Sequence, residues 1–247
     1  MALNKAKVIT VTSVKGGTGK TTTAINLANL ISKNNKKTII LDFDLYSGAV
    51  STLLNINHTQ DIYTLNEDMM NNRFNEFKDY TSSLNENLDV LSAPIDPRSV
   101  SKISAKFIDI LLTRLELQYD VIIIDTNHIL DKTNLTAFDH STYILYVITN
   151  DLIDIKNMKT MITIHEDMES NNYKIILNES RSANTSYTPY EIKNILGKDI
   201  DYIIPKSFYI KQIDKFIYNG KILTEDKMIL NSKGGKELEK ITKDILG

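Results

Sequence analysis

The chain has 247 residues, of which 42% are hydrophobic and 24% are charged, and its formal net charge is −2. This composition is typical of a globular protein that is long enough to bury a sizeable core. The lack of cysteine excludes a disulfide framework and thiolate metal sites, and the small net charge provides no global basic field for nucleic acid or anionic lipid. No apolar run approaches the roughly 20 residues of a membrane-spanning helix, and the N-terminal run is too short for a signal peptide. We therefore expect a cytoplasmic protein without a transmembrane segment.

Short β-branched runs alternate with longer amphipathic segments along the chain. The predicted strands are 7–14, 37–44, 88–94, 120–126, 142–149, 173–180 and 201–207. The predicted helices between them include 20–32, 100–117, 153–170 and 189–196. Several strands are nearly continuous apolar runs, as strands covered on both faces require. This order predicts an α/β fold with a mostly parallel central sheet of about seven or eight strands and helices on both faces.

The sequence contains neither an internal repeat nor a linker rich in proline or glycine. The least regular region is 55–87, which is polar and rich in asparagine, with a helix expected near 65–77. We interpret this region as an insertion. The sequence therefore predicts a single domain over residues 1–247.

A glycine-rich stretch, Lys15-Gly16-Gly17-Thr18-Gly19-Lys20-Thr21, follows the first predicted strand and opens the first predicted helix. Its glycines allow the backbone N–H groups to face phosphates, and the helix adds the positive end of its dipole. Lys20 is expected to reach the β- and γ-phosphates, and Thr21 offers a hydroxyl to Mg²⁺. This context predicts a P-loop that binds ATP or ADP with Mg²⁺. The alternative is an ordinary glycine-containing turn.

Carboxylates end two of the predicted strands. Asp42 and Asp44 are two residues apart at the end of the second strand, so we expect them to point to the same face. Asp125 ends the fourth strand. Carboxylates beside a P-loop suit the ordering of Mg²⁺-bound water and of an attacking water. The alternative for each is a capping carboxylate at the start of the next helix.

The stretch K-G-G-T-G-K-T-T resembles the deviant Walker A motif of the ParA/MinD superfamily of P-loop ATPases. That resemblance implies that Lys15 crosses a dimer interface and touches the partner's nucleotide, so that ATP lies between two protomers of a homodimer. It implies a slow Mg²⁺-dependent ATPase. The alternative for Lys15 is a solvated loop lysine.

The same resemblance implies roles for the other site residues. Asp44 would orient the hydrolytic water, Asp42 would support the metal with Thr21, and Asp125 would be the Walker B aspartate that contacts Mg²⁺ through water. Asn178 would read the adenine edge, and Pro205 would lie where the backbone wraps near the base. The residues expected at the nucleotide are Lys15, Gly16, Gly17, Thr18, Gly19, Lys20, Thr21, Thr22, Asn178 and Pro205.

Two departures from the partitioning members of the superfamily are similar to the CpaE/TadZ branch, whose ATPases place Flp/Tad pilus machinery. Asp44 is followed by Leu45-Tyr46-Ser47-Gly48, and Asp125 is followed by a turn without proline or glycine that contains His128. His128 is open to two interpretations, a switch residue or a plain loop residue. Members of this branch commonly carry an N-terminal receiver-like domain, which we do not find here. We therefore expect either a shorter relative or a truncated chain, and the abrupt start is consistent with truncation.

The C-terminal segment places Leu238, Ile241, Ile245 and Leu246 on one helical face. MinD-type relatives end in a basic membrane-binding helix, but acidic residues balance the lysines here, so we expect a helix packed on the domain.

The resemblance leaves two possible cellular roles. One is a positioning ATPase for a pilus or secretion assembly, with protein partners and recruitment to a pole or a membrane-associated complex. The other is a DNA-partitioning ATPase, although the charge does not indicate DNA binding.

Overall fold

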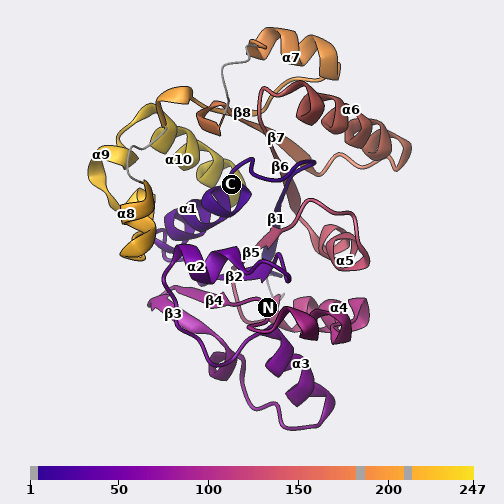
Figure 1. Cartoon of the computed structure of the whole chain (residues 1–247), viewed down its shortest axis with the longest axis vertical. Helices are drawn as coiled ribbons and strands as arrows, with labels where there is room; N and C mark the ends of the chain where they lie inside the picture. The colour runs from indigo at the N-terminus through magenta and orange to yellow at the C-terminus, as the bar shows by residue number, and fades with distance from the viewer. Residues whose placement is uncertain (1–4, 182–186, 209–212) are drawn as a thin grey trace.

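The computed structural model describes residues 5–181, 187–208 and 213–247 (Figure 1). The strands of this part of the chain form one eight-stranded sheet in the order β3-β4-β2-β5-β1-β6-β7-β8. They are β1 (Lys7–Thr12), β2 (Thr38–Phe43), β3 (Ser82–Asn85), β4 (Leu88–Leu91), β5 (Val121–Thr126), β6 (Tyr143–Ile148), β7 (Tyr173–Asn178) and β8 (Tyr202–Ile204). Every neighbouring pair is parallel except β3 and β4. The predicted α/β fold is confirmed.

Helices connect the strands. They are α1 (Lys20–Ser32), α2 (Ala49–Leu53), α3 (Ile62–Met70), α4 (Ala105–Leu115), α5 (Lys132–His140), α6 (Leu152–Asp167), α7 (Pro189–Leu196), α8 (Ile213–Tyr218), α9 (Lys227–Leu230) and α10 (Lys233–Leu246). Short 3-10 turns are η1 (Phe77–Tyr80), η2 (Pro97–Lys102), η3 (Glu179–Arg181), η4 (Lys206–Phe208) and η5 (Leu223–Glu225).

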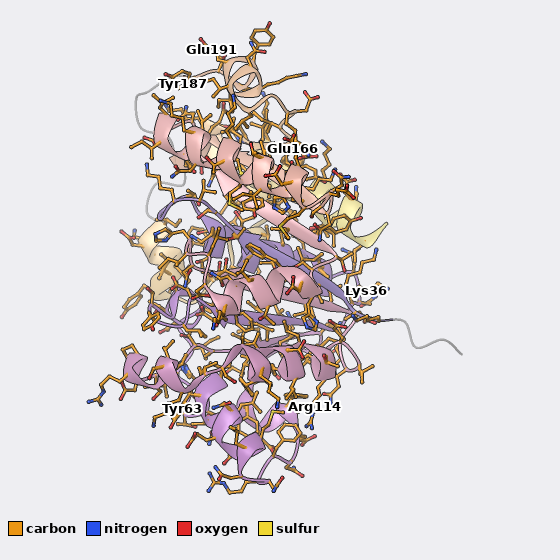
Figure 2. The ribbon with its side chains drawn as sticks, turned by 90° about the vertical axis from the view of Figure 1, so that its right-hand side faces the viewer. Lys36, Tyr63, Arg114, Glu166, Tyr187 and Glu191 are labelled. Carbon is orange, nitrogen blue, oxygen red and sulfur yellow. The ribbon has the colours of Figure 1, made fainter. Side chains whose placement is uncertain are left out.

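The sheet separates two layers of helices. Helices α1 and α10 cover one face, and α4, α5 and α6 cover the other (Figure 1). Figure 2 looks onto the second face, where the long helix α6 carries Glu166 and α4 carries Arg114. Because helices cover both faces of the sheet, every residue of β2 and β5 is buried. This burial explains why these strands read as continuous apolar runs.

The region between β2 and β4 differs from the prediction in two respects. Its helix, α3, begins after Asp61, whose carboxylate accepts the Thr64 N–H at 2.8 Å, and ends at Met70 rather than near residue 77. Asn72 follows in a left-handed conformation (φ 55°), which ends the helix. The strand β3 was not predicted, because its polar residues lie at the antiparallel edge of the sheet, where one face stays open.

The predicted helix 100–117 is also divided. Its first part is the turn η2, and α4 starts only after Ser104, whose hydroxyl accepts the Phe107 N–H at 3.2 Å. A serine cap satisfies an N–H group that the helix leaves free, so it fixes the start of α4.

The C-terminal helix α10 packs on α1 and β8, as expected. Leu238, Ile241 and Ile245 are buried in the core that α1 shares with the sheet. Lys7 at the start of β1 donates hydrogen bonds to the carbonyl oxygens of Ile245 (2.8 Å) and Leu246 (2.9 Å). A cation at a helix C-terminus satisfies free carbonyls and complements the dipole.

None of the helices in residues 5–181, 187–208 and 213–247 combines the length and the apolar character that a membrane crossing requires.

Candidate nucleotide-binding site

The glycine-rich stretch forms a loop between β1 and α1, as predicted. Gly17 and Gly19 adopt positive φ angles of 79° and 99°, which a side chain would strain. The Ser13 hydroxyl donates to the Lys15 carbonyl at 2.5 Å, and the Asn178 amide donates to the Thr18 carbonyl at 2.8 Å. These bonds fix a backbone curl that begins at the carboxyl end of the central strand β1, where parallel sheets bind ligands.

Lys20 is the first residue of α1, and its side chain is directed into the protein. It is only 9% exposed, and burial lowers the pKa of its ammonium group, while the charges of Asp125, Asp44 and Asp154 oppose that shift. A buried lysine at a helix N-terminus can bind phosphate oxygens as a point charge.

Asp125 ends β5 opposite Asp42 of β2 in the register of the sheet. Asp125 is 0% exposed, and within the described part of the chain neither of its carboxylate oxygens has a hydrogen-bond partner. Burial raises its pKa to about 7, opposed first by the nearby Thr21 hydroxyl and then by the charge of Lys20. A buried carboxylate without a partner destabilises the folded state unless a cation or a hydrogen-bond donor binds it. Asp125 therefore fits a Mg²⁺ site.

Asp42 has a different environment. Its two oxygens accept the backbone N–H groups of Asp44 (3.2 Å) and Val50 (3.0 Å), and Val50 belongs to the first turn of α2. Burial raises its pKa well above the ordinary value, and the charge of Asp125 adds to this effect. Asp42 therefore acts at least as a cap that shapes the loop after β2. Its predicted support of a metal stays a prediction.

Asp44 follows β2 and is half-buried. Its carbonyl accepts the Ser47 and Gly48 N–H groups, which closes a tight turn (Gly48 φ 60°). Its carboxylate contributes to the charge around Lys20. Asp44 is therefore placed at the rim of the site, where a carboxylate can order water.

Lys15 lies outside this cluster. Its side chain is 41% exposed, and its ammonium nitrogen is 3.1 Å from a carboxylate oxygen of Asp151, the residue that caps α6. The two lysines of the loop therefore have different environments within one chain. Lys20 is enclosed with the buried acids, and Lys15 pairs at the surface.

Asn178 lies at the end of β7 and is 5% exposed. Besides its bond to the phosphate loop, its amide oxygen accepts the Ser180 N–H (3.2 Å) and hydroxyl (2.6 Å). It also lines a cavity beside the loop, together with Gly19, Thr22, Phe208 and Leu238. The cavity has apolar walls that suit a planar base, but recognition of adenine by Asn178 stays a prediction.

Pro205 follows β8, and its carbonyl accepts the Phe208 N–H at 2.9 Å. It is half-buried, and the cavity wall at this point is made by Ile204 and Phe208 rather than by Pro205.

Thr21 lies in the first turn of α1 and is half-buried beside the loop. Among the residues that the structure describes, no three histidine, aspartate or glutamate side chains converge as a metal cage. A bound Mg²⁺ would therefore need oxygens from nucleotide and water in addition to Thr21 and Asp125.

Sequence reasoning missed several residues near the loop. Asp154 is 0% exposed, and one of its oxygens accepts the Thr149 N–H (2.7 Å) and hydroxyl (2.9 Å). The Asn127 side chain accepts the Ile129 N–H and the Asn134 amide, which closes the turn after β5 in place of proline and glycine. The sequence contains no signal for the burial of Asp154, because an acid in the first turn of a helix ordinarily complements the helix dipole at the surface.

The same turn brings His128 against the phosphate loop. A Cβ added at Gly16 would lie 3.9 Å from the His128 ring. The sequence placed His128 near the nucleotide, because it follows the strand that ends in Asp125, and the neighbouring positions of β1 and β5 in the sheet bring it to the loop.

A phosphate loop at the end of a central parallel strand, a buried lysine and a buried unpaired aspartate define a P-loop nucleotide-binding protein. A family model described as an AAA domain (AAA_31) matches residues 6–179, which is more than half of the chain. The chain belongs to this family.

Individual proteins are similar to the chain over nearly its whole length. A virulence plasmid ParA family protein of Chlamydia psittaci is 26% identical over 97% of this chain and 94% of its own length. The structure of a ParA family ATPase from Chlorobium tepidum has a TM-score of 0.83 at 20% identity, covering 96% of this chain and 98% of its own. A septum site-determining protein MinD from Pyrococcus horikoshii, complexed with Mg-ADP, has a TM-score of 0.80 at 20% identity, covering 97% and 96%. Over nearly its whole length the chain is therefore similar in sequence to ParA and MinD proteins, and its fold is the fold of their solved structures.

Proposed function

We propose that the protein binds ATP with Mg²⁺, hydrolyses it slowly and forms a dimer with the nucleotide between two copies. The observation that carries this proposal is the division between the two loop lysines. Lys20 is enclosed with the carboxylates that would serve its own nucleotide, whereas Lys15 has 41% of its side chain exposed at the surface of the site. An exposed cation on a phosphate loop is available to a second copy's phosphates.

The remaining residues have separate tasks in this proposal. The backbone of residues 15–19 holds the phosphates, and Thr21 and Asp125 provide oxygens to Mg²⁺. The metal, when bound, neutralises phosphate charge and orients the triphosphate. Asp44 orders the attacking water from the rim of the site. Asn178 holds the loop through Thr18 and lines the cavity in which the base would lie.

For the cellular role, we propose an ATPase that positions an assembly through protein partners, of the kind that pilus or secretion machinery requires. Two features support a partner other than DNA or lipid. The turns after Asp44 and Asp125 depart from the partitioning pattern, and the second is closed by Asn127 and Asn134. The apolar face of α10 is occupied by the core, which leaves that face unavailable to a membrane.

The alternative proposal is DNA partitioning. It is supported by the names of relatives, such as the virulence plasmid ParA family protein and a plasmid partition protein of Borrelia burgdorferi bound to AMPPNP. The formal net charge of −2 gives no global attraction to DNA, so this role would need a basic surface created by dimerisation.

Replacement of Lys15 tests the dimer. We expect Lys15→Ala to weaken dimerisation with Mg-ATP and to reduce hydrolysis, whereas ATP binding by the single chain is retained because Lys20 is intact. The matched control is Lys36→Ala, an exposed lysine in the α1–β2 connection (labelled in Figure 2), which lies where β2 begins and not at the carboxyl ends of the strands that carry the loop. Unchanged sedimentation and turnover in Lys15→Ala would refute the role of Lys15 across the dimer.

A salt series with non-specific duplex DNA separates the two cellular roles. Binding that requires Mg-ATP and falls steeply with salt would favour partitioning, because such a slope reports released counterions. ATP-dependent dimerisation without DNA binding would favour a protein-positioning ATPase.

A further inference from the structure

The contact between Lys15 and Asp151 joins the phosphate loop to the start of α6. Asp151 is the N-cap residue of this helix, and one of its oxygens accepts the N–H groups of Ile153 (3.0 Å) and Asp154 (3.2 Å) as well as pairing with Lys15. The helix therefore fixes the carboxylate in place. Lys15 reaches it from a loop with a long, flexible side chain, so the lysine is the partner that can leave.

Further contacts hold the same part of the loop against α6. The Asn157 amide, in the second turn of α6, donates to the Val14 carbonyl at 3.5 Å. Asp154 adds a second, fully buried carboxylate below the start of the helix, and within the described residues its other oxygen has no partner. The Lys15 ammonium holds the pKa of Asp151 below its ordinary value. The start of α6 is thus a negatively charged site that favours Lys15 within its own chain.

We propose that Asp151 is a positioning residue that holds Lys15 in its own protomer, and that Lys15 must leave Asp151 before it contacts the nucleotide of a second copy. This inference rests on the proposed function, in which Lys15 acts across the dimer. While the Lys15 ammonium lies 3.1 Å from Asp151, the carboxylate of its own chain neutralises part of its charge, and moving the ammonium to the partner's phosphates breaks this ion pair. The ion pair therefore opposes dimerisation, so a higher concentration of ATP is needed before the dimer forms.

The test removes the charge but keeps the helix cap. Asparagine caps helices about as well as aspartate does, so Asp151→Asn frees Lys15 while α6 stays intact. Exposed ion pairs of this kind correspond to about a two- to five-fold change in an equilibrium constant. Two such pairs break in a symmetric dimer, so the dissociation constant of the Mg-ATP dimer, measured by sedimentation with a non-hydrolysable ATP analogue, should fall by about four- to 25-fold.

A matched control exists on α9. Asp226 also caps its helix through the N–H groups two and three residues on, at 2.8 and 3.2 Å. We expect Asp226→Asn to leave the dissociation constant unchanged. Asp151→Ser, a second neutral cap, should reproduce the effect of Asp151→Asn if the latter folds poorly.

The double variant separates this inference from a general effect on folding. In the Lys15→Ala background, Asp151→Asn should change nothing, because the lysine it would release is absent. Equal tightening in both backgrounds, or no tightening of the dimer by Asp151→Asn alone, would overturn the holding role of Asp151. A Lys15→Ala variant that dimerises like the unmodified protein would instead overturn the cross-dimer role on which this inference rests.

Discussion

Replacement of Asp125 by asparagine should stabilise the nucleotide-free protein at alkaline pH. Asp125 is fully buried, and among the described residues its carboxylate has no hydrogen-bond partner, while the buried Asp42 lies opposite it in the sheet. Burial raises the pKa of Asp125 to about 7 from an ordinary 3.8. The charged carboxylate therefore opposes folding, and asparagine removes the charge while it keeps the shape.

The magnitude and sign follow from this difference in pKa. A difference of about three pH units corresponds to about 4 kcal/mol in the free energy of unfolding. Below pH 3.8 the carboxyl group is protonated in both states and costs nothing. Between 3.8 and 7 the unfolded chain ionises while the folded chain keeps its proton, so stability falls as the pH rises, and above 7 the full cost applies. An unsatisfied asparagine amide costs about 1–3 kcal/mol at every pH, so the net gain at pH 8 is about 1–3 kcal/mol.

Urea unfolding without nucleotide, from pH 4.5 to 8, measures this effect. The difference in the free energy of unfolding between Asp125→Asn and the unmodified protein should rise with pH, whatever the constant cost of the amide. The control is Asp139→Asn, an exposed acid on α5, whose difference should stay flat. A difference for Asp125→Asn that is flat or that falls with pH would refute the reasoning.

Three further predictions concern stability. Lys7→Met removes both bonds to the end of α10 and should lower the free energy of unfolding by about 1–2 kcal/mol in urea, whereas Lys36→Met should not. Gly235→Ala would place a Cβ in steric conflict with the Leu230 carbonyl oxygen, so the melting temperature should fall with a loss of about 1–3 kcal/mol in the free energy of unfolding; an unchanged melting temperature would contradict this packing. Burial lowers the pKa of His165, which contacts the Tyr146 hydroxyl, below its ordinary 6.5, with the nearby Lys198 charge adding to this shift. The contribution of His165 to stability should therefore fall as the pH drops below 6.5, where the unfolded chain binds the proton first. In a pH series of urea melts, the free energy of unfolding of the unmodified protein should fall relative to that of His165→Gln as the pH drops.

Local sequence was sufficient for most of the elements. Seven of the eight strands were predicted, because a strand covered on both faces must be apolar along its length, and the helix 20–32 was predicted with its exact bounds from its position after the phosphate loop. The exceptions have physical causes. The strand β3 is polar because it lies at the edge of the sheet, and α3 ends early at a left-handed asparagine.

For the site as well, the sequence predicted some residues and missed others. The order and spacing of its residues placed Lys20 at the start of the first helix and Asp44 and Asp125 at the ends of parallel strands, and in the structure the charges of both acids act on the buried Lys20. The sequence did not reveal Asp154, nor the two backbone N–H groups that occupy Asp42.

By itself, the sequence determined the phosphate loop, the alternation of strands and helices and the acids that end the strands, because each depends on residues within one or two turns of chain. Only the tertiary structure decided which distant groups meet. The Asn178 amide holds the Thr18 carbonyl across 160 residues, Lys7 caps a helix 238 residues away, and Lys15 pairs with Asp151. These contacts depend on the order of strands in the sheet, which places β1 between β5 and β6, and the local pattern of residues does not encode that order.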